Sequence, residues 1–279
     1  RGKVTTMGKF VCSLLRSSLN VQRGRQRQFG VDAVMLMGGN IRAGADYEQG
    51  SFFSLEALEA EIKSNEVIGI VEMPGWVLAD AIEETHAGAP IPGWMQYDSL
   101  ITEEFNEDGT SKVTQVGGEP LYRDMVYKVA TKIADLTNGQ SPTLTKYYKE
   151  HPELLPPKGA YKNIHAELMG YFARNMWRKI YESTGDVDVF QKFAEIDMDE
   201  DGVVSVDDIQ LALKTKVGLS VHEEETSLAE YVENFADANN DGKVTLADLL
   251  TFQQEMQIIH QMDRWRLAYK NKNGSLILQ

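Results

Sequence analysis

Two 12-residue stretches of the chain place oxygen-bearing side chains at alternating positions around a central glycine. Residues 197–208 read DMDEDGVVSVDD, and residues 237–248 read DANNDGKVTLAD. Oxygen atoms at every second position from the first to the ninth, and again at the twelfth, form a ligand set that suits a hard cation such as Ca²⁺. The central glycine permits the sharp turn that wraps such a loop around an ion. Both stretches are therefore predicted to bind a divalent cation.

The expected ligands follow the same spacing in the two loops. In the first loop, hereafter loop 1, they are Asp197, Asp199, Asp201, the Val203 carbonyl, Ser205 and Asp208. In the second, loop 2, they are Asp237, Asn239, Asp241, the Lys243 carbonyl, Thr245 and Asp248. Two such loops in tandem resemble an EF-hand pair. In that family the paired loops join through a short antiparallel bridge at the eighth position, which is occupied here by Val204 and Val244.

The last ligand of each loop departs from the EF-hand pattern. Both loops end in Asp, whereas the pattern has a Glu that binds the ion through both carboxylate oxygens. Asp is one methylene shorter and offers a single oxygen more readily, and a lower coordination number suits Mg²⁺. We expect Ca²⁺ as the cofactor, with Mg²⁺ as an alternative ion in the same loops. Loop 1 has four ligand carboxylates and loop 2 has three, so loop 1 is expected to bind first.

The acidic charge of the chain is concentrated around these loops. The net charge is −14, and residues 186–248 contain 17 acidic residues against 4 lysines. The rest of the chain is almost neutral, so the acidity belongs to the metal-binding region rather than to a general repulsion of nucleic acid. We also expect no nucleic-acid partner. Cys12 is the only cysteine, which excludes an internal disulfide and a cysteine metal site. No apolar run has the length of a membrane span.

Strands and helices alternate through the first half of the chain. Apolar runs predict strands at residues 31–37, 67–73, 94–97, 112–116 and 125–131. Helical spacing of apolar residues predicts helices at residues 4–15, 54–62 and 76–84. Residues 107–109 (Glu-Asp-Gly) are typical of a hairpin turn. This alternation indicates a mixed α/β layer.

The second half begins with a segment rich in Pro, Lys and Tyr at residues 138–158, which is expected to be a connector. Residues 161–181 then carry apolar side chains four apart and predict an amphipathic helix, packed within the protein or free to bind a partner. Residues 249–262 should form the helix that leaves loop 2. The expected domains are residues 1–140, a connector and helix at 141–183, the EF-hand pair at 184–262, and a tail at 263–279.

Four segments of the first half resemble, in order, the C-terminal substrate-binding domain of the 5′-nucleotidase group of metallophosphoesterases. The strand at 31–37 and the following Gly-Gly-Asn-Ile-Arg resemble the family's Asn-Gly-Gly-Gly-Ile-Arg segment. Residues 67–75 resemble its strand ending in Leu-x-Gly, and residues 93–97 resemble its Gly-Phe-Leu-Gln-Val strand. Residues 118–131 resemble its closing segment. The resemblance implies an α+β (mixed α/β) domain, followed here by the all-α EF-hand pair.

The resemblance also implies a substrate site, formed by Gly38, Gly39, Asn40 and Arg42. Glycines let backbone N–H groups approach an anion, and a guanidinium can bind two phosphate oxygens. Without the family, the same residues are typical of a plain strand-to-helix turn.

Three departures from the family bear on the substrate. Met37 replaces the family's Asn ligand, no aromatic residue lies near Ser64, and residues 139–142 replace its Gly-Gly-Asp-x-Phe segment. We therefore expect a phosphorylated small molecule as substrate, whether a nucleotide, another phosphate or a sugar-linked compound.

Hydrolysis in this family belongs to a separate N-terminal domain that holds two metal ions. The five histidines of this chain are scattered, without an Asp-x-His or Gly-Asn-His run, so we expect no catalytic residues and no activity in this chain alone. A chain that starts at Arg1 is expected to be a fragment whose catalytic domain precedes it. Two hypotheses follow. The chain is the calcium-binding C-terminal portion of a 5′-nucleotidase-like phosphoesterase of nucleotide catabolism, or a non-catalytic EF-hand sensor on a degenerate nucleotidase scaffold.

Overall fold

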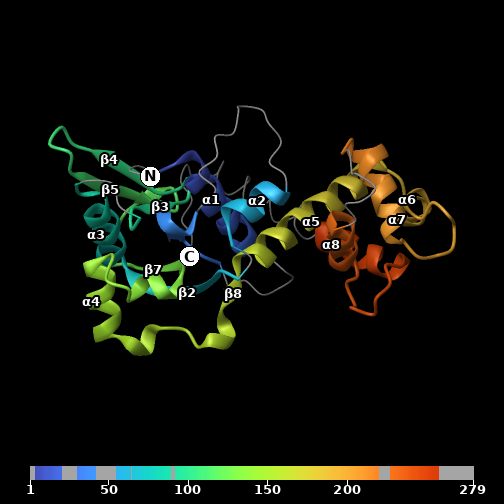
Figure 1. The fold of residues 1–279 in the computed structure, drawn as a ribbon. Helices are drawn as coiled ribbons and strands as arrows, with labels where there is room; N and C mark the ends of the chain where they lie inside the picture. Colours follow the sequence, from blue (N-terminus) through green and yellow to red (C-terminus); the bar gives the residue numbers. More distant parts are fainter. Residues whose placement is uncertain are drawn as a thin grey trace, which may run out of the picture. The chain divides into compact units, whose positions relative to one another are not determined.

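The computed structural model describes residues 4–20, 30–41, 55–63, 65–88, 92–219 and 227–257. The chain forms two compact units, Arg1–Leu168 (unit 1) and Met169–Gln279 (unit 2) (Figure 1). The division between the two units falls inside the helix Ile164–Ser183. The domain boundaries expected from the sequence, at 140/141 and 183/184, stay predictions. Among the described residues, no helix is long and apolar enough to cross a membrane.

A five-stranded mixed sheet forms the centre of unit 1. In spatial order its strands are β3 (Met95–Tyr97), β1 (Ala33–Met37), β7 (Val126–Thr131), β2 (Val67–Pro74) and β8 (Lys162–Asn163). Strands β1 and β7 are parallel, and the other neighbours are antiparallel. All five residues of β1 are buried, as a continuous apolar run predicts for a central strand. The strands expected near residues 31–37, 67–73, 94–97 and 125–131 are confirmed.

Helices cover both faces of this sheet because successive side chains of a strand point to opposite sides. Ala33, Met35 and Met37 of β1 join a core with buried residues of α3 (Gly75–His86) and α4 (Pro142–Glu150). Helix α1 (Thr6–Asn20) packs against β1 and β3. In Figure 1, α3 and α1 lie on either side of β3. Helix α2 (Leu55–Glu61) lies within the helix expected at residues 54–62.

A smaller antiparallel sheet contains β4 (Thr102–Phe105), β5 (Ser111–Val116) and β6 (Glu119–Pro120). Strands β4 and β5 form the hairpin expected from residues 107–109. Gly109 has a φ of 82° there, a left-handed conformation that glycine adopts without a steric penalty.

The segment expected to be a connector contains α4 and contributes to the core of unit 1. Ser141 caps the N-terminus of α4, where its Oγ accepts a hydrogen bond from Leu144 N at 3.2 Å, and Pro142 occupies the first turn of the helix. Leu144 and Tyr148, four residues apart, are fully buried. The difference from the expectation arises because a Ser-Pro pair starts a helix here and one helical face is apolar. The short 3₁₀ turns η4 (Pro152–Leu154) and η5 (Lys158–Ala160) follow.

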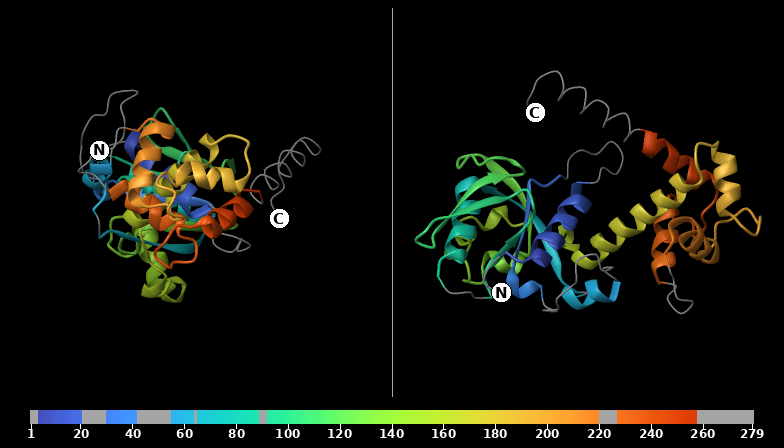
Figure 2. Two further views of the ribbon diagram at one scale, coloured as in Figure 1. Left: turned by 90° about the vertical axis from the view of Figure 1, so that its right-hand side faces the viewer. Right: turned by 90° about the horizontal axis from the view of Figure 1, so that it is seen from above.

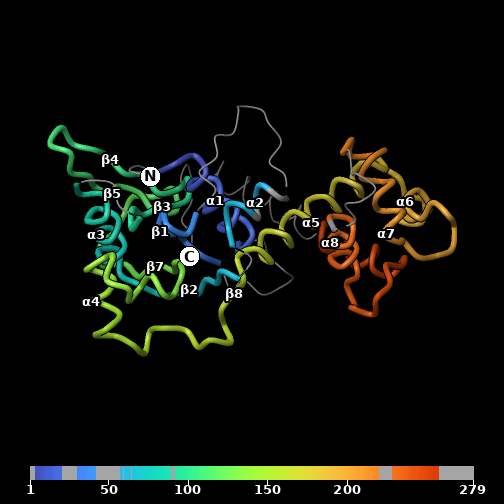
Figure 3. Tube along the Cα trace, in the orientation of Figure 1, coloured from blue at the N-terminus to red at the C-terminus, as the bar shows by residue number. Residues whose placement is uncertain are grey.

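Helix α5 (Ile164–Ser183) confirms the helix expected at 161–181, begins in unit 1 and ends in unit 2. Unit 2 continues through α6 (Val189–Ile196), α7 (Val206–Ala212), the π-helical turn η6 (Leu213–Val217), α8 (Ser227–Ala236) and a helix at 246–257. Trp177, Ile180 and Phe252 belong to its apolar core. Figure 3 traces this succession of helices and loops, and Figure 2 gives two further views of the elements. The rest of the expected exit helix and the tail lie outside the described residues.

Candidate functional site: a divalent cation centre

The helices on either side of loop 1 position the first and last of its expected ligands. Asp188 starts α6 by accepting hydrogen bonds from Phe190 N (2.9 Å) and Gln191 N (3.0 Å), and the helix ends at Ile196, directly before Asp197. Helix α7 begins with a capping box in which Ser205 Oγ accepts from Asp208 N and Asp208 Oδ2 accepts from Ser205 N. Three ligand positions therefore coincide with helix ends.

The backbone of loop 1 turns back around the expected ligands. Glu200 (φ 59°) and Gly202 (φ 88°) take left-handed conformations. Gly202 N donates to Asp197 Oδ2 at 2.9 Å, and Val203 N donates to Asp201 Oδ1 at 2.8 Å. These bonds hold the carboxylates toward the inside of the loop.

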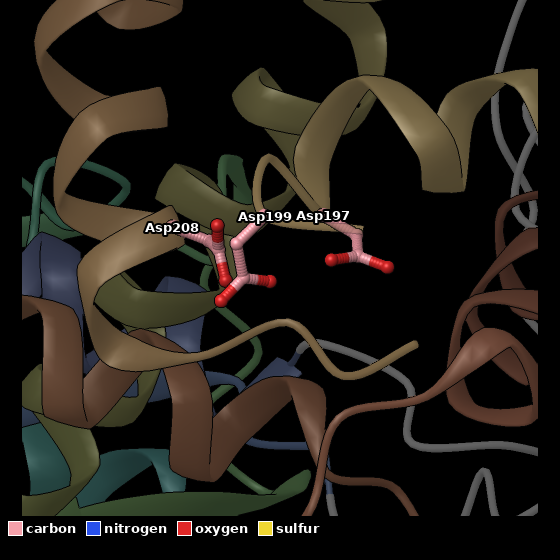
Figure 4. Close-up of side chains that lie close together, drawn as sticks. All are labelled: Asp197, Asp199 and Asp208. Atoms are coloured by element: carbon pink, nitrogen blue, oxygen red, sulfur yellow. The ribbon is translucent and has the colours of Figure 1, made fainter. Parts of the chain in front are cut away.

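Three carboxylates of loop 1 come together. Asp197, Asp199 and Asp208 each offer an oxygen within 4.8 Å of the others (Figure 4). Asp197 is only 4% exposed, and its buried Oδ1 has no hydrogen-bond partner among the described residues. A buried carboxylate oxygen without a partner is unfavourable, most of all beside other carboxylates, unless a cation compensates it. The all-oxygen donor set fits a hard divalent cation.

The charge around Asp199 agrees with this interpretation. The hydrogen bond from the Asp201 amide lowers the pKa of Asp199, but desolvation and the nearby Asp201 and Asp208 carboxylates outweigh it and leave the pKa raised. The neighbouring carboxylates therefore disfavour the ionised form of Asp199. A bound cation would remove this repulsion.

Loop 2 repeats the backbone of loop 1. Asn240 (φ 59°) and Gly242 (φ 82°) are left-handed, and Gly242 N donates to Asp237 Oδ2 at 2.8 Å. The expected bridge at the eighth position is confirmed, because Val204 and Val244 pair and Val204 N donates to Val244 O at 2.8 Å.

The two loops differ in their carboxylates. In the part of the chain that the structure describes, the only group of three carboxylates close enough to share an ion lies in loop 1. Loop 2 has the neutral Asn239 at its third position, where loop 1 has Asp199. Loop 1 is the more acidic site.

The twelfth residue of each loop accepts hydrogen bonds from other residues of the same loop. Asp208 Oδ1 accepts from Met198 N (3.0 Å), and its Oδ2 accepts from Ser205 N (2.9 Å) and Ser205 Oγ (2.7 Å). Asp248 accepts equivalent bonds from Ala238 N and Thr245. An ionised carboxylate has about four lone-pair sites. The three hydrogen bonds to Asp208 therefore leave about one of these sites unused.

The glycine loop of unit 1, residues 38–40, uses its amides within the protein. Gly38 N donates to Trp94 O at 2.9 Å, and Gly39 N donates to Pro92 O at 2.8 Å. The family resemblance predicts that these amides face a phosphate, whereas in the structure both donate to backbone carbonyls. The antiparallel pairing of β1 with β3 continues past the end of β1 and takes up both donors. A Cβ on Gly38 would lie 3.1 Å from Trp94 O, so this close approach favours glycine.

Asn40 belongs to a buried polar cluster. Its Nδ2 donates to Asp135 Oδ2 at 2.6 Å, and its Oδ1 accepts from Lys132 Nζ at 3.2 Å. Lys132 also pairs with Glu66 at 2.5 Å. Burial raises the pKa of Asp135, and the Asn40 hydrogen bond and the Lys132 charge offset only part of this effect.

Sequence reasoning did not single out the partners of Asn40, because they lie far along the chain and form no local motif. Arg42, the remaining expected substrate residue, lies outside the described residues.

Two family models match the chain. The model described as 5′-nucleotidase, C-terminal domain, matches residues 1–142, and an EF-hand model matches residues 190–213. The first match covers half of the 279 residues, so the chain belongs to the 5′-nucleotidase C-terminal domain family. Its second unit carries an EF-hand. No curated protein matches the chain.

Two solved structures are similar to parts of the chain. One is a 5′-nucleotidase precursor from Thermus thermophilus, at 16% identity and a TM-score of 0.40, covering 58% of this chain and 32% of that one. The other is an NAD nucleotidase from Haemophilus influenzae, at 13% identity and a TM-score of 0.41, covering 61% of this chain and 29% of that one. The matched part spans about a third of the length of each nucleotidase.

Proposed function

We propose that unit 2 is an EF-hand pair that binds Ca²⁺ in both loops and accepts Mg²⁺ at the same positions. The observation that carries this proposal is the buried Asp197 Oδ1, which has no partner among the described residues and lies beside Asp199 and Asp208. The match of an EF-hand model to residues 190–213 supports it. The proposed ligands are the twelve groups that the spacing of the two loops predicts.

The proposed order of binding follows from charge. Loop 1 brings three carboxylates together, whereas loop 2 has the neutral Asn239 in one of these positions. More ligand charge strengthens Ca²⁺ binding. Loop 1 should therefore fill before loop 2.

We propose for unit 1 the role that its family suggests. Unit 1 would contribute to binding a phosphorylated small molecule in a 5′-nucleotidase-like phosphoesterase, while a two-metal domain of that enzyme would perform hydrolysis. The family match over residues 1–142 supports this role. Arg42 is the proposed anion contact, because the amides of Gly38 and Gly39 already donate to backbone carbonyls.

The second candidate function is a non-catalytic EF-hand calcium sensor on a degenerate nucleotidase scaffold. The use of the glycine-loop amides and of the Asn40 side chain within the protein favours it. Titration of the full chain with adenosine monophosphate and with inorganic phosphate separates the two functions. Saturable binding that Arg42→Ala abolishes supports the nucleotidase role, and binding of neither compound supports the sensor.

Calorimetric titration of the metal-free full chain with CaCl₂, and separately with MgCl₂, tests the cation proposal. We expect two Ca²⁺ binding events, with the tighter one weakened in Asp197→Asn and the weaker one weakened further in Asp237→Asn. A chain that binds neither ion would refute the proposed function of unit 2.

A further inference from the structure

Unit 2 contains a buried lysine whose charge is satisfied by neutral oxygens. Lys192 is 6% exposed, and its Nζ donates to Tyr181 O (3.2 Å), Thr184 Oγ1 (2.9 Å) and Gly185 O. The ammonium also lies 4.5 Å from the centre of the Tyr181 ring. No carboxylate pairs with it among the described residues. An ammonium has three N–H donors, and each of them has an acceptor here.

One of these acceptors, Tyr181 O, lies in the last turn of α5, and the other two belong to Thr184 and Gly185, which directly follow the helix. The last carbonyls of a helix have no partner within the helix, and the partial negative charge there favours a cation. Gly185, at a φ of 80°, lies just past the last residue of α5, Ser183, and donates its N–H to Glu182 O at 3.1 Å. Lys192 completes this end of α5, although it comes from the next helix, α6.

Helix α6 leads directly into loop 1. It has only eight residues and ends at Ile196, directly before Asp197, the first proposed ligand of the cation. Isolated helices of this length are not stable in water, so contacts with other elements must hold α6 in place. The bonds of Lys192 to α5 are such contacts, five positions before Asp197.

We propose that Lys192 is a positioning residue that couples the order of the α5–α6 corner, residues 181–188, to cation binding in loop 1. This inference rests on the proposed function of unit 2. Coupling of this kind is reciprocal: a bound cation orders the corner, and an ordered corner raises the affinity for the cation. Because α5 begins in unit 1 and ends in unit 2, the corner would connect the cation site to the helix shared by both units.

The test compares the full-length wild type with Lys192→Met, Lys192→Arg and a charge control, Lys214→Met. Lys192→Met keeps the apolar stem and removes the donors, whereas Lys214 is exposed and its loss changes the net charge alone. We measure Ca²⁺ affinity by calorimetry and hydrogen exchange of residues 181–188 with and without Ca²⁺.

For Lys192→Met we expect Ca²⁺ binding by loop 1 about fivefold weaker than in Lys214→Met, at the low end of typical coupling. The Ca²⁺-dependent protection of residues 181–188 should be lost in Lys192→Met and retained in Lys192→Arg and in the control. Equal affinity and retained protection in Lys192→Met would overturn the proposal. If Lys192→Met does not fold, a wild type that binds Ca²⁺ without added protection at 181–188 overturns it as well. A wild type that binds no cation instead removes the proposed function.

Discussion

Loop 1 of unit 2 and the glycine loop of unit 1 were both expected to be ligand sites, and the structure treats their polar groups in opposite ways. In the glycine loop, both amides donate to backbone carbonyls, and the Asn40 side chain lies between Asp135 and Lys132. In loop 1, the buried Asp197 Oδ1 has no partner among the described residues, and two further carboxylates lie beside it.

This difference distinguishes polar groups that stabilise the fold from polar groups that are available to bind a ligand. Most buried polar groups in proteins have hydrogen-bond partners, so an exception requires an explanation. The cation that we propose for loop 1 would supply that explanation. The glycine loop requires no ligand to satisfy the groups that the structure describes, and the glycine at position 38 is explained by its close approach to Trp94.

The largest expected effect is on the Ca²⁺ affinity of loop 1. Asp197→Asn should weaken Ca²⁺ binding by loop 1 roughly 100-fold, because the buried carboxylate is replaced by a neutral amide and ligand charge sets affinity. Calorimetry measures the affinity. Asp207→Asn is the matched control, because it removes one exposed acidic charge from the same loop without removing a proposed ligand. Equal affinities of the two variants would mean that Asp197 is not a ligand.

The next effect tests the glycine loop. Asn40→Ala should lower the free energy of unfolding of unit 1 by about 2 kcal/mol, because Asp135 and Lys132 lose a buried partner. Chemical denaturation measures the loss, and Ca²⁺ affinity should not change. Asn106→Ala, which removes an exposed side chain-to-side chain bond of the β4–β5 hairpin, should cost much less. Unchanged stability together with weaker phosphate binding would reverse the comparison and make Asn40 a ligand residue.

A smaller effect sharpens the assignment of the ion. Asp208→Glu should raise the Ca²⁺ affinity of loop 1 about tenfold relative to Mg²⁺, because Glu can bind Ca²⁺ through both oxygens. The capping box with Ser205 should survive, since Glu is the usual residue at this position of the box. Competitive titration with both ions measures the selectivity, with Asp248→Glu as the equivalent change in loop 2. If neither affinity changes, Asp208 does not contact the ion.

The smallest effect concerns a buried carboxylate of unit 1 that, unlike Asp197, has partners. Glu103 accepts from Tyr97 Oη at 2.8 Å and pairs with His86 Nδ1 at 2.7 Å. Desolvation raises the pKa of Glu103. The hydrogen bonds and the His86 charge lower the pKa by more than desolvation raises it, so the net pKa lies below its usual value. The resulting stabilisation is complete above the unfolded pKa of about 4.3 and is lost as pH falls through the lower folded pKa.

Thermal unfolding measured between about pH 5 and about pH 3 tests this sign. The wild type should lose more stability over this range than Glu103→Gln, which cannot titrate at this position. Glu104→Gln, an exposed change on the same strand, should behave like the wild type. The same slope in the wild type and Glu103→Gln would show that the partners of Glu103 do not stabilise its charged form.

Local patterns in the sequence were sufficient for most elements of both units. The strand at β1, the β4–β5 hairpin and the amphipathic helix α5 each follow from periodicity or turn residues within a short window. Helix α4 was missed because the Pro, Lys and Tyr content of residues 138–158 is typical of a connector. Its role depends on Leu144 and Tyr148 reaching a core built from distant strands.

The sequence by itself determined the chemistry that each loop offers, because ligand type, ligand spacing and the central glycine are all local properties. Only the tertiary structure decided which of these groups is left for a ligand. Asn40 is taken up by residues more than ninety positions away, and Lys192 completes a helix to which it does not belong. Asp197 Oδ1 is left without a donor among the described residues. Hydrogen-bond satisfaction is a sum over neighbours in space, and a linear pattern does not contain it.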